Sequence, residues 1–357
     1  MKTLPLWIHK DFRFDKKSFE SADELCSFVE ESYPEATDLI NSWMNKDGVI
    51  EVKTSGSTGS PKIVQLSREQ MMASARATGG FFNLGPKSSA LLCLPLKYIA
   101  GKMMLVRALT LGWHLHGVQP EVELDFQKDI QFDFAAMTPL QVTYNMVKLL
   151  QIETLLVGGG PVGQNLKDNL KAYTTRAFAS YGMTETSTHV ALRPLNPAAA
   201  PNYKNETYTA LPGVFFRVDE RDCLVIHCPR IADEDIITND VIELISETSF
   251  IWKGRFDNVI NSGGVKFFPE EVEQKFSRCM NQRFFAAGMK DDVLGQKLIF
   301  VVEGQKNDNL LIELKQHQIN SKNRIKKIEV PKQLVFVSSF AETETRKIDR
   351  LKTLKMV

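Results

Sequence analysis

The chain has 357 residues, which is longer than one typical compact domain and indicates two or three folded units. Hydrophobic residues (43%) and charged residues (24%) occur as in ordinary globular proteins, which excludes a largely disordered, collagen-like or disulfide-scaffold chain. Because 44 Lys and Arg balance 43 Asp and Glu, no overall charge directs the protein to nucleic acid or to an anionic membrane.

The five cysteines are scattered and contain no Cys-x-x-Cys pair, which is typical of a reducing compartment. No apolar run is long enough for a signal peptide or for a membrane-spanning helix. We therefore expect a cytoplasmic protein.

The first 48 residues are polar and helix-like, with Leu25, Phe28 and Val29 on one helical face. From residue 49, short apolar strands alternate with helical segments, which predicts a doubly wound α/β domain with a mostly parallel sheet. The strands are predicted at residues 49–54, 63–66, 90–94, 134–137, 154–157 and 176–179. One helix is predicted to start after Ser67, with Gln70 completing a capping box, and others cover residues 103–111, 141–150 and 163–173.

A proline-rich segment at residues 194–201 precedes a region of closely spaced strands. Strands predicted at residues 214–218, 223–227, 241–245 and 250–252 leave no room for helices, so we expect a small antiparallel or barrel-like β subdomain. A small α+β unit is predicted to begin near Asp257. Its elements are helices at residues 269–280 and 308–319 and strands at residues 283–287, 298–302 and 334–337.

The run Thr-Ser-Gly-Ser-Thr-Gly-Ser-Pro-Lys lies between the first two predicted strands. Small residues let backbone N–H groups approach phosphate oxygens, hydroxyl groups add donors, and the lysine adds a positive charge. This composition predicts a phosphate-binding loop made by Thr54, Ser55, Gly56, Ser57, Thr58, Gly59 and Lys62. Its spacing differs from that of the P-loop NTPases. The alternative is a flexible Ser/Gly linker.

A second run, Ser-Tyr-Gly-Met-Thr-Glu-Thr from Ser180 to Thr186, follows a predicted strand, where open α/β sheets bind ligands. Its aromatic ring can stack on a base, and the carboxylate of Glu185 can bind magnesium. The alternative is a strand-to-helix turn capped by Thr184. Further along, Asp240 can accept hydrogen bonds from ribose hydroxyl groups.

These motifs occur in the order found in the acyl-adenylate-forming superfamily, which includes the acyl-CoA synthetases, and the chain resembles this family over about residues 49–350. The matching segments are residues 54–62, 181–185, 238–240, 254–273 and 345–350. The resemblance implies an N-terminal domain (residues 1–256) that binds ATP and an acid and is shortened at its N-terminus. It also implies a C-terminal lid domain (residues 257–357) that rotates between two reaction steps.

The resemblance also implies a role for each matching residue. Lys347 would bridge the acid and the α-phosphate, with Glu185, which binds magnesium, and Thr184 as further catalytic residues. Asp257 would be the hinge, and Gly263 and Gly264 would leave room for CoA. Nucleotide binding would involve the phosphate-binding loop together with Gly159, Gly160, Ser180, Tyr181, Gly182, Met183, Asp240 and Arg255. The chain departs from the family at Asn239 and Arg346, where glycine is usual.

Within the superfamily the chain is similar to the o-succinylbenzoate:CoA ligases, through residues 94–101 and the later Arg107. Lys97 and Tyr98 stand where those ligases have an aromatic residue and a histidine. Two cations, Lys97 and Arg107, near the acid site would suit a dicarboxylate, because one carboxylate reacts and the other must be neutralised. His189 is a further candidate for this acid site. The alternative for both cations is solvent exposure.

The activity implied is an ATP-dependent acid:CoA ligase that forms an acyl-AMP intermediate, uses ATP, Mg²⁺ and CoA, and belongs to menaquinone biosynthesis. Its partners would be small molecules, and we expect neither a nucleic-acid partner nor a membrane span. A homodimer is an open alternative to a monomer. Two alternatives remain within the ligases: another aryl or acyl acid, and a carrier protein as acceptor. A third alternative is a non-catalytic nucleotide-binding protein.

Overall fold

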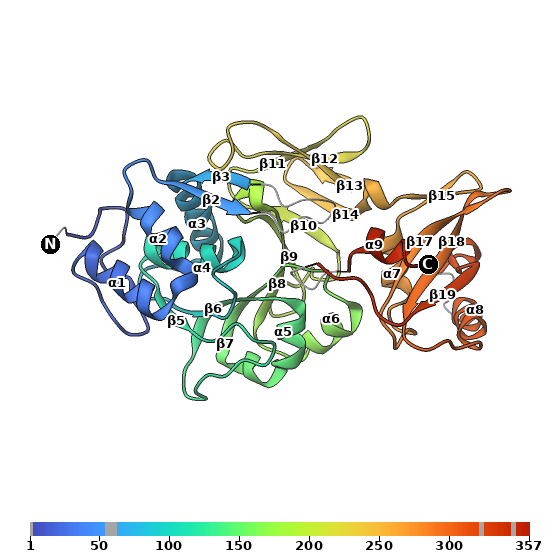
Figure 1. Ribbon diagram of the computed structural model, residues 1–357, viewed down its shortest axis with the longest axis horizontal. Helices are drawn as coiled ribbons and strands as arrows, with labels where there is room; N and C mark the ends of the chain where they lie inside the picture. The colour runs from blue at the N-terminus through green and yellow to red at the C-terminus, as the bar shows by residue number, and fades with distance from the viewer. Residues whose placement is uncertain (1–2, 54–62, 321–324, 344–347) are drawn as a thin grey trace.

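The structure, a computed structural model, describes residues 3–53, 63–320, 325–343 and 348–357 (Figure 1). Within these residues twelve strands form one large sheet, five strands form a smaller sheet, and two strands form a separate hairpin. The large sheet and its helices occupy the left and centre of Figure 1, and the smaller sheet lies at the right. None of the helices in the described part of the chain is long and apolar enough to cross a membrane.

One half of the large sheet is parallel, in the order β1-β5-β4-β6-β7-β8. These strands are β1 (Arg13–Phe14), β4 (Ser89–Leu92), β5 (His114–Gly117), β6 (Phe132–Met137), β7 (Ile152–Val157) and β8 (Arg176–Gly182). Successive side chains of a strand point to opposite faces of the sheet. Phe134 and Leu156 therefore belong to one buried cluster, and Ala135 and Leu155 belong to another.

Helices cover both faces of these parallel strands. The first cluster includes residues of α1 (Ala22–Ser32), α2 (Thr37–Met44), α3 (Arg68–Phe82) and α4 (Ile99–Leu111). The second includes residues of α5 (Pro139–Tyr144) and α6 (Gln164–Leu170). The doubly wound α/β arrangement predicted from the sequence is confirmed.

The other half of the large sheet is antiparallel and continues from β8 in the order β9-β10-β14-β13-β12-β11. These strands are β9 (His189–Pro194), β10 (Thr207–Ala210), β11 (Phe215–Val218), β12 (Cys223–His227), β13 (Ile236–Ser246) and β14 (Ser249–Arg255). The expected antiparallel strands are present. Because β9 and β10 join them to the parallel strands, they extend the large sheet instead of closing into a barrel-like unit.

The strands on either side of the predicted phosphate-binding loop pair with each other. They are β2 (Val49–Lys53) and β3 (Ile63–Ser67), and they form an antiparallel hairpin apart from the large sheet. The loop itself lies outside the described residues. After β3, Ser67 and Gln70 form the predicted capping box of α3, with hydrogen bonds of 3.1 and 2.8 Å.

The helix expected at residues 141–150 is divided into α5 and a 3₁₀ turn (Met146–Gln151). Asn145 lies at the break, and its side chain bonds to another segment instead of facing solvent. Its amide donates to the carbonyl of Val122 at 2.7 Å and accepts from the N–H of Leu124 at 2.9 Å. A polar side chain that pairs with distant backbone groups in this way competes with helix continuation.

The C-terminal part of the chain is an α+β unit, as expected. Its strands are β15 (Ile260–Ser262), β16 (Val265–Phe267), β17 (Phe284–Asp291), β18 (Gly295–Glu303) and β19 (Gln333–Val337). Its helices are α7 (Pro269–Phe276), α8 (Leu310–Asn320) and α9 (Arg350–Leu354), so α7 is shorter than predicted. This unit has its own buried cluster, which includes Phe276, Phe300 and Leu314. The domain boundary at Asp257 stays a prediction.

Candidate active site

The carboxyl ends of β7 and β8 carry two of the predicted nucleotide-binding segments. Gly158 directly follows β7, and a Cβ atom there would lie 2.5 Å from the hydroxyl of Ser180 on β8. Gly159 has a φ of +82°, a conformation that favours glycine. Ser180 donates to the carbonyl of Val157 at 3.2 Å. The glycine turn at residues 158–160 therefore lies against the end of β8, at the edge where such sheets bind ligands.

The residues after β8 form a tight turn that exposes Glu185. A Cβ atom at Gly182 would lie 2.2 Å from the carbonyl oxygen of Thr188, so only glycine fits. The 3₁₀ turn Thr184–Thr186 follows, with the Thr186 hydroxyl accepting from the N–H of Met183 at 2.9 Å. The described residues contain no group of three potential metal ligands. The exposed carboxylate of Glu185 offers an oxygen ligand of the kind that magnesium prefers.

Tyr181, Asp240, Trp252 and Arg255 form a cluster, called here the Asp240 cluster. The Tyr181 hydroxyl donates to Asp240 Oδ2 at 2.7 Å, and the Trp252 indole donates to Asp240 Oδ1 at 3.1 Å. Arg255 Nη1 lies 3.8 Å from the same Oδ1, because Asp240 and Arg255 are paired across β13 and β14. The structure thus brings together three residues predicted from the sequence. Trp252 was not predicted, since a single indole in a strand belongs to no recognisable motif.

Burial raises the pKa of Tyr181 well above its ordinary value, and the adjacent Asp240 carboxylate raises this pKa further. The hydroxyl group therefore keeps its proton at neutral pH and acts as a donor. Asp240 is itself buried and is fixed in position by the phenol and the indole.

Arg107 is buried inside the N-terminal part of the chain, with only 1% of its surface exposed, so the alternative of solvent exposure is wrong for this residue. Its guanidinium donates to the hydroxyl groups of Thr188 at 3.0 Å and Thr78 at 3.3 Å, and lies 3.4 Å from His189 Nδ1. Thr78, Arg107, Thr188 and His189 are called here the Arg107 cluster. Thr78 lies on α3 and Arg107 on α4, while His189 starts β9. Sequence reasoning found Arg107 and His189 but not the two threonines.

The Arg107 cluster carries a positive charge that no carboxylate of the described residues pairs with. Burial lowers the pKa of Arg107 to about 9, which leaves it charged at neutral pH, and within the described residues no Asp or Glu pairs with it. Burial, and then Arg107, lower the pKa of His189 well below its ordinary value. Because arginine has only donors, His189 Nδ1 accepts, and its Nε2 carries the proton toward the Thr78 hydroxyl at 3.4 Å.

Lys97 is in a different environment from Arg107. It is exposed, and its ammonium group lies 5.4 Å from the centre of the Tyr98 ring. Tyr98 directly precedes α4, the helix on which Arg107 lies. The two cations expected at the acid site therefore do not form one buried group.

Comparisons with known proteins show the family to which the chain belongs. The family described as AMP-binding enzyme matches residues 23–223, which is more than half of the sequence. The chain belongs to the AMP-binding enzyme family. This confirms the resemblance to the acyl-adenylate-forming superfamily.

Two relatives of this AMP-binding enzyme are named 2-succinylbenzoate–CoA ligase. The one from Listeria monocytogenes is 24% identical over 343 residues, with 88% of this chain and 71% of the relative covered. The one from Bacillus cereus is 25% identical over 351 residues, with 87% and 70% covered.

Two solved structures share the fold. An acyl-CoA synthetase (AMP-forming)/AMP-acid ligase II-like protein from Dyadobacter fermentans is 36% identical, with 93% of this chain and 97% of that chain covered, at a TM-score of 0.59. The o-succinylbenzoate coenzyme A synthetase from Bacillus subtilis, solved with ATP and magnesium ion, is 18% identical, with 85% and 69% covered, at a TM-score of 0.72.

Several predicted site residues of this AMP-binding enzyme lie outside the described residues. They are Thr54, Ser55, Gly56, Ser57, Thr58, Gly59, Lys62 and Lys347. Gly263 and Gly264 form the turn between β15 and β16, with φ values of +57° and +80°. In Figure 1 this turn lies at the outer end of the C-terminal unit, whereas α9 lies on the side of that unit nearer the large sheet.

Proposed function

We propose that this AMP-binding enzyme is an ATP-dependent acid:CoA ligase whose substrate is o-succinylbenzoate. The buried Arg107 carries the choice of acid. A guanidinium removed from water costs several kcal/mol unless an opposite charge compensates it, and a dicarboxylate brings one carboxylate beyond the one that reacts. The names of the relatives from Listeria monocytogenes and Bacillus cereus support the same acid.

The proposed reaction has two steps. In the first, an oxygen of one acid carboxylate attacks the α-phosphorus of ATP, the bond to the β-phosphate breaks, and acyl-AMP and pyrophosphate form. In the second, the CoA thiolate attacks the acyl carbon and AMP leaves. A carboxylate is already ionised at neutral pH, so the first step needs neutralisation of charge more than a general base.

Each group of residues would have one task in this reaction. The Asp240 cluster would bind the nucleoside, with the Asp240 carboxylate accepting from the ribose hydroxyl groups. The loop from Thr54 to Lys62 would bind the β- and γ-phosphates, and Lys347 would bridge the acid and the α-phosphate. When bound at Glu185, magnesium would neutralise phosphate charge. Gly263 and Gly264 would admit the CoA arm after the C-terminal domain (residues 257–357) has rotated about Asp257.

The Arg107 cluster would recognise the second carboxylate of the acid. Its main donor is the Arg107 guanidinium, which lies 3.3 Å from the Thr78 hydroxyl and 3.0 Å from the Thr188 hydroxyl. The Thr78 hydroxyl donates its own proton to the carbonyl of Ser74 at 3.1 Å and so accepts from Arg107. His189 is neutral, so it keeps an acceptor toward Arg107 and adds no second positive charge. One net positive charge in this cluster matches one carboxylate.

The test is pyrophosphate release measured with a panel of carboxylic acids, with and without CoA. We expect o-succinylbenzoate to give acid-dependent pyrophosphate release, and CoA to convert the product to a thioester. Benzoate and 4-oxo-4-phenylbutanoate are the matched controls, because each keeps only one of the two carboxylates of o-succinylbenzoate. A faster reaction with a monocarboxylate would contradict the choice of acid, and ATP binding without pyrophosphate release from any acid would contradict the ligase activity. Product analysis with free CoA also distinguishes CoA from a carrier-protein acceptor.

A further inference from the structure

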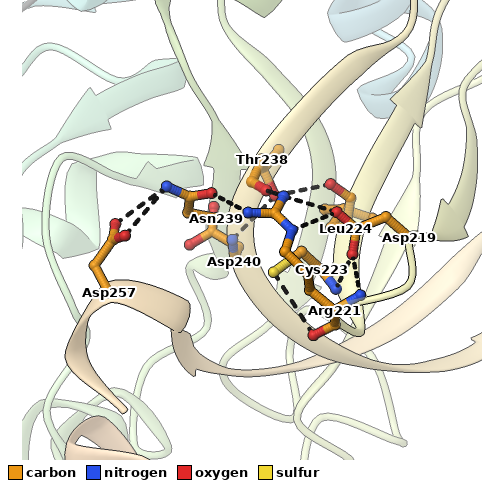
Figure 2. Close-up of polar contacts among 8 residues, drawn as sticks. All are labelled: Asp219, Arg221, Cys223, Leu224, Thr238, Asn239, Asp240 and Asp257. Carbon is orange, nitrogen blue, oxygen red and sulfur yellow. Dashed lines mark hydrogen bonds and ion pairs between the residues drawn. The ribbon is translucent and has the colours of Figure 1, made fainter.

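The side chain of Asn239 connects the predicted hinge residue to the large sheet (Figure 2). Its amide nitrogen donates to both carboxylate oxygens of Asp257, at 3.3 and 3.2 Å. Its amide oxygen accepts from Nη1 of Arg221 at 2.9 Å. Asn239 lies on β13 directly before Asp240, so one strand carries both the proposed ribose ligand and this contact to the hinge.

Arg221 fixes the orientation of the Asn239 amide. Its guanidinium donates twice to Asp219 Oδ2, at 2.9 and 2.7 Å, and once to the carbonyl of Thr238 at 3.0 Å. Asp219 in turn accepts from the N–H of Cys223 at 2.9 Å. An arginine offers only donors, so the oxygen of the amide must face it and the NH₂ group must face Asp257.

Asp257 therefore has two donors from the antiparallel half of the sheet. Asn239 is one, and Arg255 on β14 is the other, with its Nη2 3.0 Å from Asp257 Oδ2. Asp257 lies in a short 3₁₀ turn (Phe256–Asn258) directly before β15. Any rotation of the C-terminal unit that changes the backbone at Asp257 moves its carboxylate relative to both donors.

The resemblance to the superfamily puts glycine at position 239, and glycine has no side chain with which to contact the hinge. The contact is thus a property of this chain's own sequence. The orientation that it stabilises presents α9, which follows Lys347 in the chain, toward the large sheet and keeps the Gly263–Gly264 turn at the outer end (Figure 1). Given the proposed roles of these segments, this is the orientation needed for acyl-AMP formation.

We propose that Asn239 is a positioning residue, which binds the hinge carboxylate and so favours the acyl-AMP-forming orientation of the C-terminal unit over the thioester-forming one. This inference rests on the proposed function for the two steps but adds a residue that the motifs do not assign. The Asn239 side chain contacts Asp257 and Arg221, and neither of these is proposed to bind the acid or the reacting phosphate. It acts through Asp257.

The experiment compares wild type with Asn239→Ala in the two half-reactions, measured separately on the full chain. Loss of a hydrogen bond to a charged group should slow acyl-AMP formation about three- to tenfold. Thioester formation from supplied acyl-AMP and CoA should stay unchanged or become faster. Equal slowing of both half-reactions, or no change in either, would overturn the proposal.

A double-mutant cycle tests whether Asn239 acts through the hinge. In an Asp257→Ala background, the additional Asn239→Ala change should have no further effect on the ratio of the two half-reaction rates. An effect of the same size in both backgrounds would show that Asn239 acts elsewhere. Because the comparison is between ratios, a general loss of folded protein does not imitate the expected result.

Hydrogen exchange of the ligand-free protein separates this inference from the proposed function. The amide of Val259 donates to the carbonyl of Phe256 at 3.2 Å, so its exchange reports opening of the hinge turn. Asn239→Ala should accelerate this exchange about three- to tenfold whatever acid the enzyme uses. Unchanged exchange would overturn the inference even if the ligase activity is found. Faster exchange without activation of any acid would instead contradict the proposed function while the contact between Asn239 and the hinge stands.

Discussion

At the scale of single residues, the proposed function predicts that Arg107 distinguishes acids with two carboxylates from acids with one. Arg107→Met keeps much of the side-chain length and removes the buried charge. We expect the KM for o-succinylbenzoate to rise about 10- to 100-fold, because a hydrogen-bonded ion pair with the second carboxylate is lost. The KM for benzoate should change by less than about threefold, since that acid offers no second carboxylate.

The control for this prediction is Arg76→Met, which removes an exposed guanidinium from α3, the helix that also carries Thr78. Steady-state kinetics with both acids check the prediction. If Arg107→Met raised both KM values by the same factor, Arg107 would not recognise the second carboxylate.

His189 gives the stability of the protein a defined pH dependence. Its pKa in the folded protein is lowered well below the ordinary value of 6.5, mainly by burial. In acid the unfolded chain therefore binds a proton that the folded chain does not, and the free energy of unfolding falls as the pH drops through about 6.5. Above that pH both states are neutral at this residue and its contribution is complete.

His189→Asn should reduce this dependence, because the amide oxygen can accept from Arg107 and the group does not titrate. Denaturant unfolding between pH 5 and pH 8 measures the difference between the variant and wild type. Parallel curves over this range would show that His189 is not the group responsible.

At the scale of elements, the pairing of β13 with β14 builds the Asp240 cluster. The register places Asp240 opposite Arg255 and brings the Trp252 indole to the same carboxylate. Trp252→Phe keeps the aromatic packing and removes this donor. We expect the KM for ATP to rise about three- to tenfold, with the KM for the acid unchanged.

Initial rates measured with ATP and the acid varied in turn check this prediction. Trp113→Phe is the matched control, since Trp113 is buried in the first hydrophobic cluster and belongs to no predicted site. Equal effects of the two substitutions on the KM for ATP would show that the Trp252 effect is a general loss of packing.

Elements were predictable from the sequence where local patterns decide them. The parallel strands β4, β6, β7 and β8 are short apolar runs between turns, and each overlaps its predicted segment. β9 was not predicted, because it is buried yet contains His189 and Arg193, so it shows neither alternation nor a continuous apolar run. The joining of the two halves of the sheet depends on β9 and could not be foreseen without it.

The residues of the candidate site were also predictable only where they lie in a sequence motif. Tyr181, Asp240 and Arg255 lie in ordered motifs, and the structure brings them together as the resemblance implied. Thr78, Thr188 and Trp252 are single polar residues on elements distant in the sequence, so no spacing pattern marks them. Their contribution depends on how α3, the turn before β9, and β14 pack, which only the folded chain determines.

At the scale of the whole molecule, ion pairs join the C-terminal unit to the large sheet domain. Arg278 Nη2 lies 2.8 Å from Asp168 Oδ2 on α6, and Lys253 on β14 lies 3.6 Å from Glu271 on α7. Rotation of the C-terminal unit must break such contacts. Because the Arg278 pair is largely exposed, its contribution is expected to be at most about 1 kcal/mol.

Arg278→Gln should therefore shift the ratio of the two half-reaction rates by less than about fivefold, toward thioester formation. Salt screens exposed pairs, so the shift should shrink when both proteins are compared at about 1 M salt. Rates of both half-reactions at low and high salt measure it. A shift larger than that of Asn239→Ala, or one that salt does not reduce, would contradict the expectation that this exposed ion pair contributes less than the contact between Asn239 and Asp257.

The position of Arg255 has a consequence for nucleotide affinity. One guanidinium lies 3.8 Å from Asp240 through Nη1 and donates to Asp257 through Nη2. In the proposed enzyme the nucleoside and the hinge therefore share a single cation. Bound nucleotide changes the preference between the two orientations by some factor. By thermodynamic linkage, a change of orientation then changes the affinity for nucleotide by the same factor. The affinity for AMP would then depend on the hinge orientation, so AMP binding and domain rotation share one coupling free energy.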